Sequence, residues 1–303
     1  MDYITKYDLN PAKTILWMTE SQLTCNIRMY PQYIKTLLEK HGNGMEKASV
    51  YSGELSHLEI SVNTTYYAYF AYMLGGLLRR LSNKFRPYEV VKGDTNRALN
   101  FSTQVIEQAF LGNETLDNAL SWSMKQFDDI RVNSIRKPLV AIFGDLFVRD
   151  NDLMNQQLIK TIEDAGGEVI NTPYNDYTKI TIENVIRRRV ASGKNLEAIG
   201  FRTLLSGLKY IEKRYYKHFE RYLGKYSEID GKKLEKNLEK FNINPYHSGE
   251  SYDNILKIFH ILDKYTEVSL FEKTNPAYFC PSLITEAMKT QIHKATAVPK
   301  VNI

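Results

Sequence analysis

Two cysteines are the residues of this sequence whose type and placement best suit metal or redox chemistry. Cys25 and Cys280 are the only thiols among 303 residues, and we expect each on a loop that leads from a strand into a helix. A thiol just before a helix amino terminus has a lowered pKa, because the helix dipole and nearby N–H groups stabilise the thiolate. The pair therefore predicts shared metal ligands or a reduced thiol pair; two inert, buried cysteines are the alternative.

Other chemical motifs lack their local signatures. The sequence has no CxxC or HxxxH spacing of the kind that holds zinc, and no GxGxxG, GxxxxGK[ST] or GxSxG motif. Its six histidines are scattered. We therefore expect neither ATP hydrolysis nor serine-hydrolase chemistry from this chain.

The elements that must position Cys25 form a strand–helix–strand pattern. Residues 13–18 are an apolar run, residues 30–40 have apolar side chains at helical spacing, and residues 48–51 offer a second strand. An aromatic helix over 63–81 follows, which is typical of a core element or a subunit contact. Two amphipathic helices, near 94–111 and 116–132, complete this part of the chain.

A second set of alternating elements would position Cys280. The apolar run at 139–143 is typical of a central parallel strand, and Asp152 is expected to open the helix that follows it. Further along the chain, we expect a strand at 168–171, a helix at 252–264, a strand at 267–271, a helix at 283–294 and a strand at 298–303. Such alternation builds parallel sheets with sites at the carboxyl ends of their strands.

These patterns predict an α/β protein with two facing lobes. Each lobe would contain flavodoxin- or Rossmann-like βαβ units with a parallel sheet. The N-terminal α/β and helical lobe would span residues 1–134 and the C-terminal α/β lobe residues 135–303, with a large basic helical insertion at about 179–247. If the lobes face each other across a cleft, the two thiols could enter one site.

Composition limits the compartments and partners of the chain. The 40 basic residues exceed the 35 acidic ones by a net charge of only +5, which argues against nucleic-acid binding. The longest apolar stretch, residues 68–78, is well short of the roughly 20 residues that cross a bilayer. The amino terminus has no apolar segment of the secretory kind. We expect a cytoplasmic protein without a membrane span.

The positive charge is concentrated in the helical insertion. Residues 179–240 contain twice as many basic as acidic side chains, and four of them recur at every fourth position: Lys209, Lys213, Lys217 and Arg221. At helical spacing these four form one stripe. The stripe is typical of a solvated helix face; the alternative is a docking surface for an acidic partner or for nucleotide-like phosphates.

A series of motifs resembles a known family. The run RKPLVAIFGDLFVRDN at 136–151, followed by Asn155, and the run NPAYFCPSLITEAM at 275–288 resemble the 2-hydroxyacyl-CoA dehydratase D-component family. They resemble most closely its branch of acyl-CoA dehydratase activase-related proteins. The short runs RPYE at 86–89 and SGES at 248–251 resemble landmarks of that branch, and the similarity extends from about residue 24 to the end.

This resemblance implies two α/β lobes and iron–sulfur chemistry. In the family, cysteine thiolates hold a [4Fe–4S] or larger cluster, which receives electrons from an ATP-dependent activase and reduces an acyl-CoA thioester. Cys280 matches the late cysteine of the family, and Cys25 is the candidate for the early one. Residues expected to contact the substrate or support the cluster are Arg149, Asn155, Glu250, Ser282 and Glu286, of which Ser282 would cap a helix.

The chain also departs from the family pattern. Members commonly carry two adjacent cysteines where this sequence has Phe279 and Cys280, and a cluster normally needs three or four protein sulfurs. The cluster would therefore be shared between chains, be completed by non-protein ligands, or be absent. We expect a dimer that works with an activase or a dehydratase-like partner subunit. The alternatives are a noncatalytic scaffold and a CoA-ester-binding protein.

Overall fold

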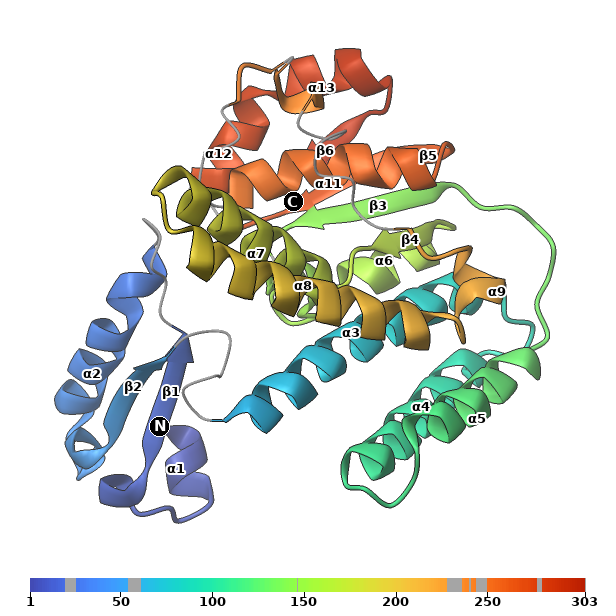
Figure 1. Ribbon diagram of the computed structural model, residues 1–303. Coiled ribbons are helices and arrows are strands. Elements are labelled where there is room, and N and C mark those ends of the chain that lie inside the picture. Colours follow the sequence, from blue (N-terminus) through green and yellow to red (C-terminus); the bar gives the residue numbers. More distant parts are fainter. Residues whose placement is uncertain are drawn as a thin grey trace. The chain divides into compact units, whose positions relative to one another are not determined.

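The chain is a mixed α/β structure with parallel sheets in the computed structural model (Figure 1). The structure describes residues 1–19, 26–53, 61–145, 147–227, 236–239, 241–243, 250–276 and 280–302. Contacts divide the chain into two compact units, residues 1–69 and 70–303. The lobe boundary that we expected at residues 134 and 135 stays a prediction. None of the described helices is both long and apolar enough to cross a membrane.

The first unit contains the expected strand–helix–strand arrangement. Its elements are α1 (Asp2–Lys6), β1 (Ile15–Thr19), α2 (Tyr30–His41) and β2 (Ser49–Gly53). The two strands are parallel, with Trp17 opposite Tyr51. A small core of Ile4, Leu38, Met45 and Ala48 joins the helices to the sheet. Helix α2 ends at His41. Gly42, which follows it, has a φ of +66°, a value that glycine adopts more easily than other residues.

Long helices make up much of the second unit. They are α3 (Val62–Phe85), which begins in the first unit, α4 (Asp94–Phe110), α5 (Leu116–Asp128), α7 (Tyr174–Ala191), α8 (Asn195–Tyr216) and the short α9 (Glu220–Leu223). Helices α4 and α5 pack against each other, as do α7 and α8 (Figure 1). Helix α3 approaches the start of α7 closely, since a Cβ atom on Gly76 would lie 2.7 Å from Pro173 Cβ.

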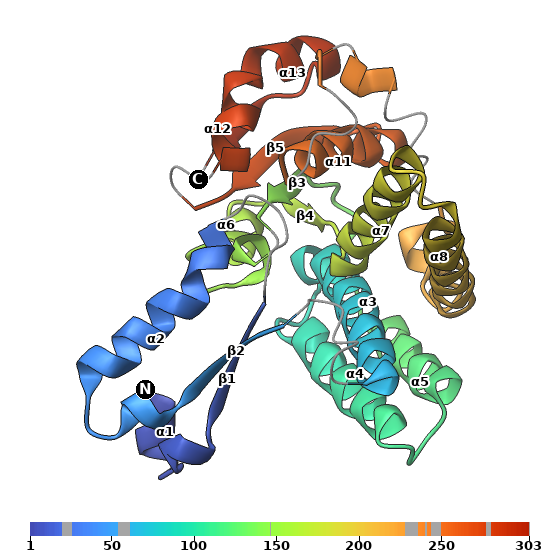
Figure 2. The ribbon, with the colours of Figure 1, turned by 60° about the vertical axis from the view of Figure 1, so that its left-hand side comes forward.

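A four-stranded parallel sheet organises the rest of the second unit. Its order is β4 (Glu168–Asn171), β3 (Leu139–Gly144), β5 (Val268–Thr274) and β6 (Lys300–Asn302). The remaining helices are α6 (Leu158–Asp164), α11 (Glu250–Lys264), α12 (Cys280–Ala287) and α13 (Lys289–Thr296). Strand β3 is central, as its uninterrupted apolar sequence predicts. Figure 2 shows β3, β4 and β5 together with α11.

Apolar side chains cover both faces of the central strand. Ala141 and Phe143 belong to a core cluster with side chains from α11 and α13 such as Ile258 and Ile292. The intervening Ile142 packs with Leu158 and other residues of α6. This alternation follows from the two-residue period of a strand, which turns neighbouring side chains to opposite faces.

Two of the predicted helices have different bounds. The helix expected from Asp152 begins at Leu158, and Gln156 and Gln157 before it have φ values of +56° and +58°. Asn151 Oδ1 accepts the N–H groups of Leu153 and Met154, each at 3.1 Å, so the side chain competes with helix formation there. The helix expected at 283–294 is two helices, because the chain turns at Met288.

Two further expectations about helix termini and surfaces were wrong. Ser282 does not precede a helix, because α12 already begins at Cys280. The basic stripe does not follow one helix either: α8 ends at Tyr216, and Arg221 belongs to α9. Lys209 Nζ lies 3.3 Å from Glu183 Oε1 on α7, so part of the stripe pairs with a neighbouring helix.

Candidate functional site

The carboxyl ends of β3 and β5 are tied together at one point. The N–H of Asp145, just beyond β3, donates to Thr274 O at 2.9 Å and to Asn275 Oδ1 at 2.9 Å. Gly144 has a φ of +123°, and a Cβ atom there would lie 2.1 Å from Thr274 O. Only glycine therefore permits this close approach of the two strands.

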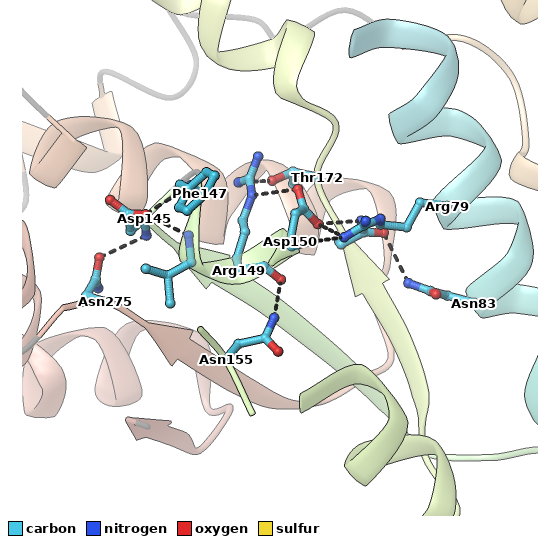
Figure 3. A network of polar contacts seen from close by, with 11 residues as sticks. Arg79, Asn83, Asp145, Phe147, Arg149, Asp150, Asn155, Thr172 and Asn275 are labelled. Carbon is cyan, nitrogen blue, oxygen red and sulfur yellow. Dashed lines mark hydrogen bonds and ion pairs between the residues drawn. The ribbon is translucent and has the colours of Figure 1, made fainter. Parts of the chain in front are cut away.

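The carboxylate of Asp145 shapes the segment that follows β3. Its Oδ1 accepts the N–H groups of Phe147 at 2.9 Å and Val148 at 2.8 Å. These two bonds form a side-chain turn that leads into a short 3₁₀ helix over Val148–Asp150. As a result Arg149 and Asp150 lie at the carboxyl edge of the sheet (Figure 3).

Arg149 and Asn155, both predicted as site residues, are close together and buried. The Arg149 side chain is 0% exposed, and its Nη1 donates to Thr172 Oγ1 at 2.7 Å, just beyond β4. Asn155 Nδ2 donates to Arg149 O at 3.0 Å, while its Oδ1 accepts the N–H of Leu158 at 3.1 Å. Asn155 thereby connects the Arg149 segment to the first turn of α6.

Asp150 connects this edge to helix α3. Arg79 Nη1 donates to Asp150 O at 2.6 Å and to Asp150 Oδ1 at 3.0 Å. Asn171, the last residue of β4, donates to the same carboxylate oxygen at 3.3 Å and accepts from Asn83 at 3.3 Å. Figure 3 shows Asp150 between Arg149 and Arg79. A polar network thus fixes the ends of β3 and β4 against α3.

The end of β5 combines three polar residues in the interior. Glu272 is 4% exposed, and Lys273 and Thr274 are each 1% exposed. Burial raises the pKa of Glu272 to about 7 and lowers the pKa of Lys273. Such buried, perturbed groups at a strand end are typical of functional sites.

Lys273 of β5 and Lys300 of β6 lie near α12, on the face of the sheet opposite to Glu272 and Thr274. Burial, together with the positive charge of Lys273, lowers the pKa of Lys300 to about 8. Lys300 Nζ donates to Thr285 O at 2.8 Å and lies 3.5 Å from Glu286 Oε2. Glu286 also lies 3.6 Å from Lys289 Nζ. The predicted site residue Glu286 is therefore a counterion for lysines in this structure.

The other predicted site residues are placed only in part. Cys280 is the first residue of α12, beyond the carboxyl end of β5. Ser282 is in the first turn of the same helix, and Glu250 is the first residue of α11. The side chains of these three residues, and the whole of Cys25, lie outside the described residues.

The described side chains do not fit a complete iron–sulfur site. Among them, no group of three or more histidine, cysteine, aspartate or glutamate residues is arranged to hold a metal ion. The full sequence has two cysteines, whereas a cluster is usually held by about four thiolates. One chain therefore lacks the sulfur ligands that a cluster requires.

The sequence reasoning missed several residues of this edge. They are Arg79, Asn83, Asn171, Thr172, Glu272, Thr274 and Asn275. Two signals pointed to them: polar pairs directly follow apolar strand residues, as in Asn171-Thr172, and a charged pair interrupts an otherwise apolar strand at Glu272-Lys273. Arg79 gave no such signal, because arginine on an amphipathic helix is common.

Comparisons with known proteins add no relative: no protein-family model, no curated protein and no solved structure matches this chain.

Proposed function

We propose that this chain is an iron–sulfur electron-transfer or reductase component that resembles the subunits of 2-hydroxyacyl-CoA dehydratases. The observation that supports the proposal best is the position of Cys280, which is the first residue of α12, six residues after the end of β5 at Thr274. A thiolate there would be stabilised by the helix N–H groups. Because one chain has two thiols, a cluster would need ligands from a second chain, and an ATP-dependent activase would supply its electrons.

Reconstitution under anaerobic conditions tests this proposal. Wild-type protein incubated with iron and sulfide is expected to bind iron as a dimer or larger assembly and to give a cluster EPR signal on reduction. Cys280→Ser should lose that signal, whereas Ser269→Ala, a change on an exposed position of β5, should keep it. Wild-type protein that binds no iron, or a signal unchanged in Cys280→Ser, would show that the proposal is wrong.

The expected flavodoxin-like sheet and the two facing lobes are part of the same proposal. The order β4-β3-β5-β6 corresponds to chain order 2-1-3-4, the order of flavodoxin-like sheets. We propose that residues 135–303 form a flavodoxin-like lobe and that it faces the N-terminal lobe expected over residues 1–134. Spin labels on the two native cysteines, Cys25 and Cys280, allow this to be measured. A distance distribution centred below about 2 nm would support facing lobes, and a long, broad distribution would contradict them.

A second candidate function is favoured by the buried polar end of β5. Ligands of open α/β sheets bind beyond the carboxyl ends of the strands, where neighbouring connections diverge, and β3 lies between β4 and β5 here. The chain would then be an acyl-CoA-binding subunit or a noncatalytic scaffold for an activase. Calorimetry with an acyl-CoA distinguishes the two alternatives. A heat of binding would identify an acyl-CoA-binding subunit, whereas no heat of binding together with binding of an activase would identify a scaffold.

A further inference from the structure

The carboxyl end of β5 contains three buried polar atoms for which the described residues supply no hydrogen-bond partner. They are Glu272 Oε1, Thr274 Oγ1 and Asn275 Nδ2. More than about 90% of buried polar groups in native proteins are paired, and an unpaired one costs about 1–3 kcal/mol. Three within four consecutive residues therefore indicate a place where something other than the described residues provides the partners.

The strand geometry places two of these atoms on one face. Glu272 and Thr274 are two residues apart on β5, so their side chains point to the same side of the sheet. Their neighbours offer no polar partner: Glu272 lies opposite Ile142 on β3 and Val301 on β6, and Thr274 lies opposite Gly144. On this face the polar side chains of β5 lie beside apolar positions of β3 and β6, and Asn171 of β4 lies on the same face beyond Ile142.

The third atom is held in a fixed direction. Asn275 Oδ1 accepts the N–H of Asp145 at 2.9 Å, which determines the orientation of the amide and hence of Nδ2. The same contact joins the segments that follow β3 and β5. The three atoms therefore lie at the carboxyl edge between β3 and β5, where the connection from β3 runs to β4 on the other side.

The charges of the surrounding groups determine which kind of ligand could bind the three unpaired atoms. Burial raises the pKa of Glu272 to about 7, so its carboxyl holds a proton below neutral pH. The charged groups on the adjoining segment are already bound: Arg149 donates to Thr172 Oγ1, and Asp145 accepts two backbone N–H groups. An ion would find no free countercharge in these groups. An amide matches them better, because its carbonyl accepts from Asn275 Nδ2 and from the protonated carboxyl of Glu272, while its N–H donates to Thr274 Oγ1.

We propose that the carboxyl end of β5 is a binding site for an uncharged amide group, held by Thr274, Asn275 and the carboxyl group of Glu272. This site does not depend on the proposed iron–sulfur function, because no cysteine takes part in it. Selection for binding would also explain why polar groups are retained in an interior where apolar ones would be more stable.

The test compares two small probes that differ in charge, acetamide and acetate. NMR titration of the full-length protein at pH 6 should give saturable shifts of the Asn275 side-chain amide with acetamide and none with acetate. Thr274→Val, which keeps the shape of the side chain, should weaken acetamide binding at least tenfold. The matched control is Thr103→Val, whose hydroxyl is exposed and bonded within α4 at 3.0 Å.

Stability and pH give two further readouts. Thr274→Val removes an unpaired hydroxyl, so the free protein should unfold at the same or a higher temperature while losing its stabilisation by acetamide. Acetamide binding by the wild type should weaken above pH 7 as Glu272 ionises, and Glu272→Gln should bind with no such pH dependence. The proposal is overturned if acetate binds instead, if neither probe gives a saturable shift, or if Thr274→Val binds acetamide as the wild type does.

Discussion

At the scale of single residues, buried charge marks the carboxyl edge of the second unit. Arg149 is fully buried and donates to Thr172, while Asp150 beside it is bound by Arg79. A buried cation contributes little net stability when it is paired, but its loss leaves the partner groups without hydrogen bonds. Arg149 therefore has a structural role here that its motif alone did not show.

Replacing Arg149 by methionine should lower the free energy of unfolding by about 2–4 kcal/mol, because the buried hydroxyl of Thr172 loses its donor and the carboxylate of Asp150 loses an ion pair with Arg149 Nε at 3.5 Å. Urea unfolding measures this. Arg136→Met is the control: the Arg136 side chain is 76% exposed and pairs with Glu267 on the surface, so its change should stay within about 1 kcal/mol. Equal losses in the two variants would contradict the structural role.

Glu272 predicts a pH dependence of stability. Its pKa rises from an ordinary value of 4.5 to about 7 on folding, so the folded protein binds more protons in that range than the unfolded chain. The stabilisation by the neutral carboxyl is complete below pH 4.5 and is lost as the pH rises through 7. Relative to Glu272→Gln, the wild type should lose on the order of 1–3 kcal/mol between these limits. Parallel unfolding curves of the two proteins across this pH range would disprove the shift.

At the scale of elements, a buried ion-pair network joins α7 to α8. Lys179 Nζ lies 2.9 Å from both carboxylate oxygens of Glu212 and 3.0 Å from Asp176 Oδ1, and Asn175 donates to Glu212 at 2.8 Å. Burial raises the pKa of Glu212, whereas in Asp176 the nearby Lys179 overcomes burial and lowers the pKa. Two carboxylates thus share one ammonium group inside the helix pair.

Glu212→Ala should destabilise the protein by about 3–5 kcal/mol, because it leaves the buried Lys179 with fewer partners. The same two helices provide a control in the exposed pair of Arg189 and Glu197, 3.1 Å apart, where Glu197→Ala should cost at most about 1 kcal/mol. Thermal unfolding compares the variants, and a double-mutant cycle with Lys179→Met measures the coupling. No coupling between positions 179 and 212 would contradict the network.

At the scale of the whole molecule, the two compact units differ in how much structure supports them. Among the described residues, the first has a two-stranded sheet and a buried core cluster of four residues, whereas the second has a four-stranded sheet with apolar clusters on both faces. A two-stranded sheet is marginally stable by itself. The first unit therefore depends on few tertiary contacts.

Native-state hydrogen exchange should show this difference. We expect the amides of β1 and β2 to exchange at least tenfold faster than those of β3 and β5, because regions with few buried contacts open more easily. The comparison is made within one sample, so unfolding of the whole chain affects both sets alike. Equal protection of the two sheets would mean that the units unfold together.

The sequence by itself determined most elements and the parallel character of the sheets. Apolar runs such as 139–143, and the glycines that end helices, act through local geometry, so their strands and helices could be predicted. Helix bounds near Asn151 and Met288 could not, because side-chain hydrogen bonds and chain turns compete with periodicity there. The aromatic helix predicted over 63–81 is present as α3, and it continues four residues further, to Phe85.

The polar edge was decided by tertiary structure. Asp145 and Asn275 are 130 residues apart in the chain, and Arg79 and Asp150 are 71 apart, yet each pair is in hydrogen-bond contact. No local pattern specifies such a meeting, because it depends on the order β4-β3-β5-β6 and on a glycine that lets two strands approach. The residue types that could do chemistry are evident from the sequence, but burial and neighbours set which of them are neutral, charged or left without a partner.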